Sequence, residues 1–192
     1  PKGLAPLEEA DYIDARLSIN LKPEYAHLLA EIFTYWSEED TADVYQNKMS
    51  GPGLWGIRPE TGIVMLEKAD FGNAVILSRL IHEGLIRKLG RYVSPAELYG
   101  TPPAFSQETY PGIAPGIAYI EKIPGAAEDE GARQRRYEAV ALAAHDCVVS
   151  DADLTTAMKL RSIEAGISAI NGAFALRSSE DPKPCRTELT QP

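Results

Sequence analysis

The sequence predicts a mainly helical domain with a small two- or three-stranded antiparallel sheet, and an α+β arrangement is the alternative. Several long segments repeat apolar residues at the three- and four-residue spacing of a helix face. Short segments within 54–68 and 117–123 have strand composition, and clusters of glycine and proline separate the elements. A chain of 192 residues suits one domain. We therefore expect a single globular domain over 1–177 and a proline-rich tail over 178–192.

The first expected helix begins at Pro23, where a missing backbone N–H costs nothing in the first turn. Residues 37–40 then have the sequence of a helix cap, and we expect a second, more acidic helix reaching about Lys48. The first helix has one apolar stripe, made of Tyr25, Leu28, Leu29, Ile32, Phe33 and Trp36.

The expected sheet begins after the breaker cluster at 50–53. Residues 54–58 and 63–68 flank a turn-like segment and predict a short hairpin, with 117–123 as a further strand. Residues 100–116 hold four prolines and three glycines, which excludes a helix or a central strand. A connection of that length is typical of a binding loop, a lid or a docking arm.

Four further helices are expected. Residues 74–89 have a broad apolar face and stop at Gly90, and the sequence Ser94-Pro95-Ala96-Glu97 caps a brief helix. Residues 128–148 form the third, and a last helix runs from the cap at 150–153 to about Arg177. The last helix carries an apolar seam of Leu160, Ile163, Ile167, Ile170 and Phe174.

The charge of the chain excludes some classes of partner. Acidic residues outnumber basic ones 28 to 19, and the resulting net charge of -9 repels nucleic-acid phosphates and anionic lipids. The apolar runs are far shorter than the roughly 20 residues of a membrane span, and the first residues lack the apolar core of a secretory signal. Cys147 and Cys185 fit no metal-ligand spacing and no disulfide framework. We expect a soluble, cytoplasmic protein that binds neither nucleic acid nor membrane.

One glycine motif proves uninformative. Residues 51–56 have the spelling GxGxxG, but the expected helix precedes the motif, Arg58-Pro59 follows it and Pro52 removes an N–H donor. We interpret the segment as a structural turn rather than a phosphate-binding loop.

His145 is the candidate catalytic residue, with Glu138 or Asp146 as the carboxylate that orients it. Helical spacing places His145 on the apolar stripe of its helix, where a half-buried imidazole beside a carboxylate is able to act as a general base. The neighbouring Cys147 diverges by about 100 degrees and does not face the imidazole. The alternative is a core histidine satisfied by one hydrogen bond.

Glu24, His27 and Glu31 project from neighbouring turns of one helix, as one half of a carboxylate and imidazole metal site would. The second half is missing from the sequence, which favours a solvated helix face. His82 and Glu83 lie on the polar face of their helix and are interpreted as surface. The sequence identifies no cofactor.

Two loops hold the candidate ligand-binding residues, which are Trp55, Arg58 and Glu60 in the first and Phe105 and Tyr110 in the second. Aromatic and charged side chains on proline-stiffened loops suit a ligand lid or a protein-binding surface. The alternative is that the aromatic rings anchor their own loops to the core.

These features favour an interaction or adaptor subunit of a homo- or hetero-oligomeric assembly, with the last helix and the tail at the contact. The alternative is a small-molecule enzyme or ligand-binding protein, with a pocket between loops 50–62 and 100–116 and the His145 helix. The sequence leaves open whether the protein is an enzyme.

Overall fold

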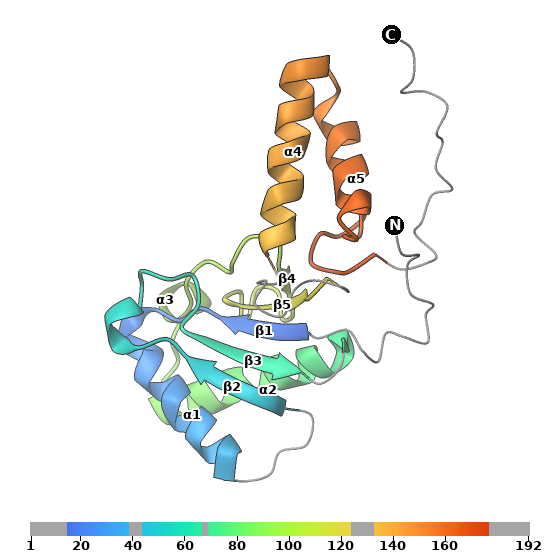
Figure 1. The fold of residues 1–192 in the computed structure, drawn as a ribbon. Helices are drawn as coiled ribbons and strands as arrows, with labels where there is room; N and C mark the ends of the chain where they lie inside the picture. The colour runs from blue at the N-terminus through green and yellow to red at the C-terminus, as the bar shows by residue number, and fades with distance from the viewer. Residues whose placement is uncertain (1–14, 39–43, 67–68, 124–132, 177–192) are drawn as a thin grey trace. The chain divides into compact units, whose positions relative to one another are not determined.

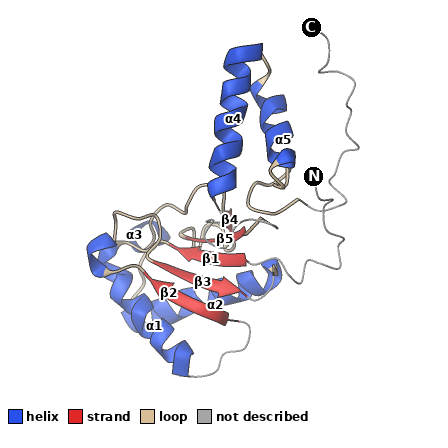
Figure 2. Ribbon diagram, in the orientation of Figure 1, coloured by secondary structure: helices blue, strands red, loops and turns tan. Residues whose placement is uncertain are grey.

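The computed structural model describes residues 15–38, 44–66, 69–123 and 133–176 (Figure 1). These residues fall into two compact units, 15–122 and 123–176. A five-stranded sheet organises the first unit, and Figure 2 shows its strands side by side. A pair of helices forms the body of the second unit. The two units are described separately below.

The sheet of the first unit is antiparallel throughout, in the order β2-β3-β1-β5-β4. Its strands are β1 (Ala15–Ile19), β2 (Val44–Met49), β3 (Gly62–Leu66), β4 (Gln107–Glu108) and β5 (Ile117–Glu121). In the central strand β1, Leu17 lies opposite Val64 on one side and Tyr119 on the other. Because β3 separates β1 from β2, these two strands run parallel and the helix between them makes a crossover connection.

Helices α1 (Ala26–Glu38) and α2 (Phe71–Leu89) cover one face of this sheet. A Cβ added at Gly62 would lie 2.8 Å from Leu29 Cδ2, so α1 packs directly on β3. The ring of Phe71 meets that of Tyr119 edge-on at 5.4 Å, so α2 covers β5 on the same face. The core between these layers consists of fully or nearly fully buried Leu17, Ile19, Leu29, Phe33, Val64, Leu77, Ile81 and Leu85. Each such side chain stabilises the fold by about 1.5–3 kcal/mol.

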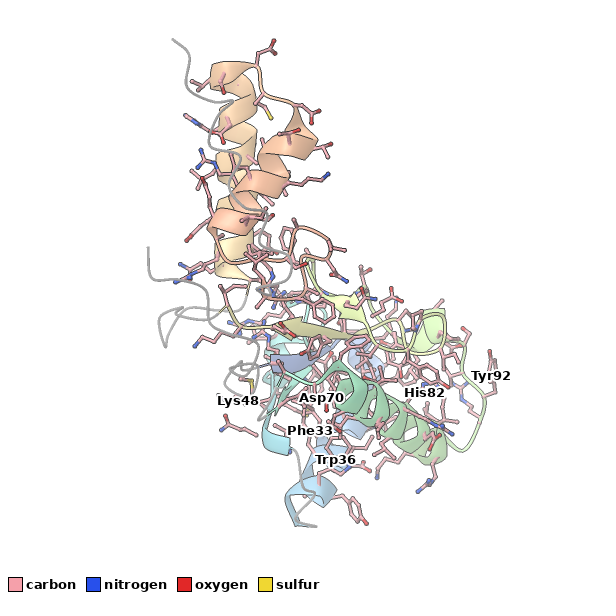
Figure 3. All side chains as sticks on the ribbon, turned by 90° about the vertical axis from the view of Figure 1, so that its right-hand side faces the viewer. Phe33, Trp36, Lys48, Asp70, His82 and Tyr92 are labelled. Atoms are coloured by element: carbon pink, nitrogen blue, oxygen red, sulfur yellow. The ribbon has the colours of Figure 1, made fainter. Side chains whose placement is uncertain are left out.

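Side-chain caps set the ends of the helices in this unit. Asp70, labelled at the start of α2 in Figure 3, accepts a hydrogen bond from the N–H of Asn73. Gly90 ends α2 at φ 63, in the left-handed region that glycine enters without a steric cost. Ser94 caps the short helix α3 (Pro95–Leu98) by accepting from Glu97 N–H. The expected helix stop at Gly90 and the expected cap at Ser94 are both confirmed.

The second unit is a helical hairpin, α4 (Gln134–Ser150) and α5 (Leu154–Glu164), followed by a short return segment. The guanidinium of Arg161 joins the two helices by donating to both carboxylate oxygens of Asp146, at 2.7 and 2.9 Å. The buried guanidinium of Arg136 holds the return segment by donating to the carbonyls of Gly172 and Ala173. The hydrogen bonds of these two arginines hold the second unit together where a larger domain would use apolar packing.

The expectation of a small two- or three-stranded sheet in a mainly helical domain is wrong. The sheet has five strands, and the sequence analysis assigned neither β1 nor β2 to it. Strand β2 falls within the second helix expected over 37–48, and residues 54–58 form a 3₁₀ turn and bends rather than a strand. In β1, Arg16 and Ser18 alternate with buried Leu17 and Ile19, and this polar half of the pattern concealed the strand.

The expected last helix to Arg177 is also wrong, because α5 ends at Glu164. Gly166 takes φ +75 and turns the chain, and Ile167 then pairs with Ala175 in an isolated bridge. The expected apolar seam is broken there, and Ile170 is 84% exposed. Within the part of the chain that the structure describes, every helix is too short or too polar to cross a membrane. The proposed tail over 178–192 lies outside the described residues.

Candidate functional site

One side of α4 packs and the other side is apolar and exposed. The packed side holds Arg136, Ala139 and Ala143, which are all buried. We define the α4 stripe as Tyr137, Ala141, Ala144 and Val148, whose spacing of four, three and four residues aligns them on another side of the helix. Tyr137 is 53% exposed and Val148 is 86% exposed. The sequence predicts one apolar stripe made of these four residues and Val140; in the folded chain the four are exposed and Val140 is half-buried.

Further large apolar side chains of the hairpin are exposed outside the α4 stripe. Leu142 and Val149 lie seven residues apart on α4, and Leu154 begins α5. Their side chains are 50%, 68% and 56% exposed, respectively. By helical spacing, Glu138 and His145 lie between the stripe and the pair Leu142 and Val149.

The structure places His145, Glu138 and Asp146 together on α4 without linking them. The side chain of His145 is 69% exposed, and its Nδ1 lies 4.0 Å from Asp146 Oδ1, which is longer than a hydrogen bond. Asp146 is bound by Arg161, and these hydrogen bonds hold the pKa of its carboxyl below the usual range. Glu138 accepts from Gln134 Nε2 at 3.3 Å. Catalysis by His145 therefore stays a prediction, as does any role for the half-buried thiol of Cys147.

The first loop brings Glu60 to the face of the sheet that α1 and α2 do not cover. Glu60 Oε1 accepts from Ser18 Oγ at 2.8 Å and lies 3.2 Å from the Arg16 guanidinium. Trp55 instead donates its indole N–H to Ser50 O at 2.9 Å within its own loop, and Arg58 is exposed. The sequence analysis missed Arg16 and Ser18, although the alternation of Arg16-Leu17-Ser18-Ile19 is a signal for a two-faced strand.

The second loop brings Tyr110 to His82, which the sequence analysis had assigned to solvated surface. His82 lies midway along α2 (Figure 3), and its Nδ1 is 2.8 Å from the hydroxyl of buried Tyr99. The ring of Tyr110 meets the imidazole edge-on at 6.3 Å. Burial lowers the pKa of His82 and raises that of Tyr99. Phe105, in the same loop, is half-buried with φ 60. No local sequence pattern predicts this cluster, because Tyr110 lies in a loop whose apolar residues have neither helix nor strand spacing.

The proposed metal half-site lies on the exposed surface of α1 and the turn before it. Glu24 and His27 are exposed, and Glu31 binds Lys88 Nζ at 2.6 Å, which holds the pKa of the Glu31 carboxyl below its usual range. Across the described ranges, no group of three or more His, Cys, Asp or Glu side chains is arranged to hold a metal ion.

Comparison with known proteins gives a likeness of fold. No protein-family model matches the chain, and no curated protein matches it. Among solved structures, an effector protein from Pseudomonas syringae pv. syringae strain 61 is similar, with a TM-score of 0.64 and 22% identity over 92% of this chain. An effector protein from Pseudomonas syringae pv. tomato strain DC3000 is similar with a TM-score of 0.65 and 20% identity over 85% of this chain. The chain spans 60% and 57% of those two proteins.

Proposed function

We propose that the protein is an interaction subunit and that the outer surface of its helical hairpin is the docking surface. The observation that carries this proposal is the exposure of the α4 stripe. Its two large members, Tyr137 and Val148, are mostly in water, while the packed side of the same helix is built from Arg136 and alanines. Burying such a stripe against another protein yields roughly 25 cal/mol for each Å² of apolar surface removed from water.

The direction of the helix pattern supports the proposal. The strongest apolar periodicity of an amphipathic helix ordinarily faces its own core. In α4 the two large residues of the stripe, Tyr137 and Val148, are exposed, whereas Ala139 and Ala143 on another side of the helix are buried. The same observation favours a docking helix over a helix that is merely tolerant of a few exposed apolar residues.

The solved neighbours give weaker support. Both are described as effector proteins, a description that fits a protein acting through contact with other macromolecules.

Site-specific photo-crosslinking tests the proposal. A photoreactive amino acid replaces Val148 in the full chain expressed in cells, and a matched control replaces Ile76, which is 60% exposed on α2. We expect a discrete crosslinked adduct from position 148 and none from position 76, with the adduct identified by peptide mass spectrometry. Adding Ala144→Glu, which places a charge in the stripe, removes the adduct. No adduct at 148, or equal adducts at 148 and 76, contradicts the proposal.

A second candidate function, binding of a small molecule with acid–base chemistry, is favoured by the His82 cluster. The imidazole is held by Tyr99, and its lowered pKa keeps it neutral near pH 7, where a neutral imidazole is able to accept a proton. Benzoate is a suitable probe, because its ring matches the edge of Tyr110 and its carboxylate competes with Glu83, which binds the nearby Arg79 at 2.7 Å. In NMR titrations, a site here shifts the ring signals of His82 and leaves those of exposed His27 unchanged. Equal shifts at both histidines, or none, would leave this candidate without support.

A further inference from the structure

We infer that the docking partner is a second copy of this chain, bound antiparallel along the α4 stripe, an inference that rests on the proposed function. The stripe is symmetric about its own midpoint, between Leu142 and Ala143. Tyr137 and Val148 lie equally far from that midpoint, and so do Ala141 and Ala144. Rotation by 180° about an axis through the midpoint therefore places Tyr137 against Val148 of the second copy and Ala141 against its Ala144. An isologous interface requires this kind of self-complementarity.

The sizes of the side chains suit a close helix pair. Alanine at both central positions lets two helix axes approach to about 8 Å, at the near end of the usual range. The larger Tyr137 and Val148 then close the two ends of the contact, where their exposed fractions of 53% and 86% leave the most apolar surface to be buried.

The charges at the two ends of α4 are complementary in the same arrangement. Arg133 precedes the helix and Asp151 follows it, and a separation of 18 residues is about five full turns, so both flank the stripe on one side. An antiparallel pair brings Arg133 of each copy to Asp151 of the other. This polarity is the reverse of what the dipole of α4 itself favours, since a cation suits a helix C-terminus and an anion suits its N-terminus.

The other flank of the stripe carries a second matched pair. Glu138 and His145 lie seven residues apart on α4, both exposed. In an antiparallel helix pair, the same side of the stripe in each copy comes together. Glu138 of one copy therefore faces His145 of the other, offset along the helix axis by about half a turn. The three α4 residues singled out by the sequence thus divide into two groups: Asp146 binds Arg161 within the hairpin, and Glu138 and His145 lie toward the partner.

Sedimentation analysis of the full chain over a range of concentrations tests the inference. We expect a monomer–dimer equilibrium that Ala144→Glu weakens about 100-fold, because the carboxylate would be buried without a partner at the centre of the contact. Ile76→Glu on α2 is the matched control and leaves the equilibrium unchanged. Circular dichroism confirms that both variants keep the helix content of the original chain. A chain that stays monomeric at every concentration overturns the inference.

A charge exchange tests the antiparallel register. His145→Glu places carboxylates opposite one another in both halves of the contact and weakens self-association, while Glu138→Lys alone has a smaller effect. An equal mixture of the two variants restores the association, because the introduced lysine of one copy then meets the introduced glutamate of the other. If the mixture associates no better than His145→Glu alone, the register is wrong.

The crosslink at position 148 separates this inference from the proposed function. An adduct of twice the chain mass, containing only peptides of this chain, supports both. An adduct with a different protein keeps the proposed function and overturns the second copy as partner. Absence of any adduct overturns both.

Discussion

The two units differ in which side chains they bury. In the first unit the fully buried positions include Leu17, Ile19, Ile81 and Leu85. In the second unit the buried apolar residues are mostly small, and they are Ile123, Ala139, Ala143, Ala157, Ile167, Ala173, Ala175 and Leu176. Among the described residues, the second unit also exposes seven large apolar side chains, as many as the longer first unit, and they are Tyr137, Leu142, Val148, Val149, Leu154, Leu160 and Ile170.

This difference agrees with the proposed docking role of the second unit, because the two units are stabilised in different ways. A buried leucine contributes about 1.5–3 kcal/mol, whereas an alanine buries a single methyl group and contributes less than about 1 kcal/mol. The second unit compensates with polar ties, from Arg136 to the return segment and from Arg161 to Asp146.

The largest expected effect is in the core of the first unit. Leu17→Ala empties a position that is 0% exposed on the central strand, and we expect a loss of about 3 kcal/mol in the free energy of unfolding. Urea denaturation followed by tryptophan fluorescence measures it, because Trp36 and Trp55 both belong to this unit. Leu142→Ala is the control in the second unit and changes that transition by less than about 0.5 kcal/mol. Equal losses from both substitutions would contradict the division into two kinds of unit.

In the second unit the most sensitive position is expected to be polar. Arg136→Met keeps the length of the side chain but removes the hydrogen bonds to the carbonyls of Gly172 and Ala173, and we expect a loss of about 2–3 kcal/mol. Hydrogen exchange measured by mass spectrometry localises the effect to peptides from α4 and residues 166–176. Lys159→Met, at an exposed position of α5, serves as control. A larger loss from Lys159→Met than from Arg136→Met would show that the polar tie is not what holds this unit.

The sequence predicts the helices of the first unit better than its sheet. Helix α1 has an uninterrupted apolar stripe, and α2 has Asp70 before it and Gly90 after it, so local patterns define both. Strand β1 depends on partners 43 residues or more away along the chain, such as Val64 and Tyr119, and five residues with a polar alternate face give little local signal. Edge strand β2 also gives little local signal, because Asn47 and Lys48 in its second half are residues that strands disfavour.

The candidate site shows the same limit in a different form. The spacing of Tyr137, Ala141, Ala144 and Val148 correctly indicates a helix with an apolar stripe. Periodicity identifies such a stripe but does not show what covers it. A stripe that packs against the protein's own core and a stripe that binds a partner have the same spacing of apolar residues. The structure adds that the side of α4 lined by Ala139 and Ala143 is the buried one, which local spacing does not reveal.

A smaller effect is expected at His82 in the first unit. Tyr99→Phe removes the hydroxyl that pairs with His82 Nδ1, and we expect a loss of about 1 kcal/mol. Burial lowers the pKa of His82, so the fold favours the neutral imidazole. The stabilisation is therefore complete above the ordinary pKa of about 6.5 and is lost as the pH falls through the lower folded pKa. NMR titration of the His82 ring measures that pKa directly, and a value at or above 6.5 would contradict the structure.

The smallest effect on stability is expected where the effect on binding is largest. Val148→Lys replaces a side chain that is 86% exposed near the end of α4, and lysine is a better helix former than valine. We expect the free energy of unfolding to change by less than about 0.5 kcal/mol, measured by urea denaturation of the monomer at low concentration. The same substitution places an ammonium group in the α4 stripe and weakens docking, which sedimentation measures at high concentration. Loss of stability without loss of docking would mean that Val148 stabilises its own hairpin and takes no part in docking. The two units would then differ in composition but not in their role.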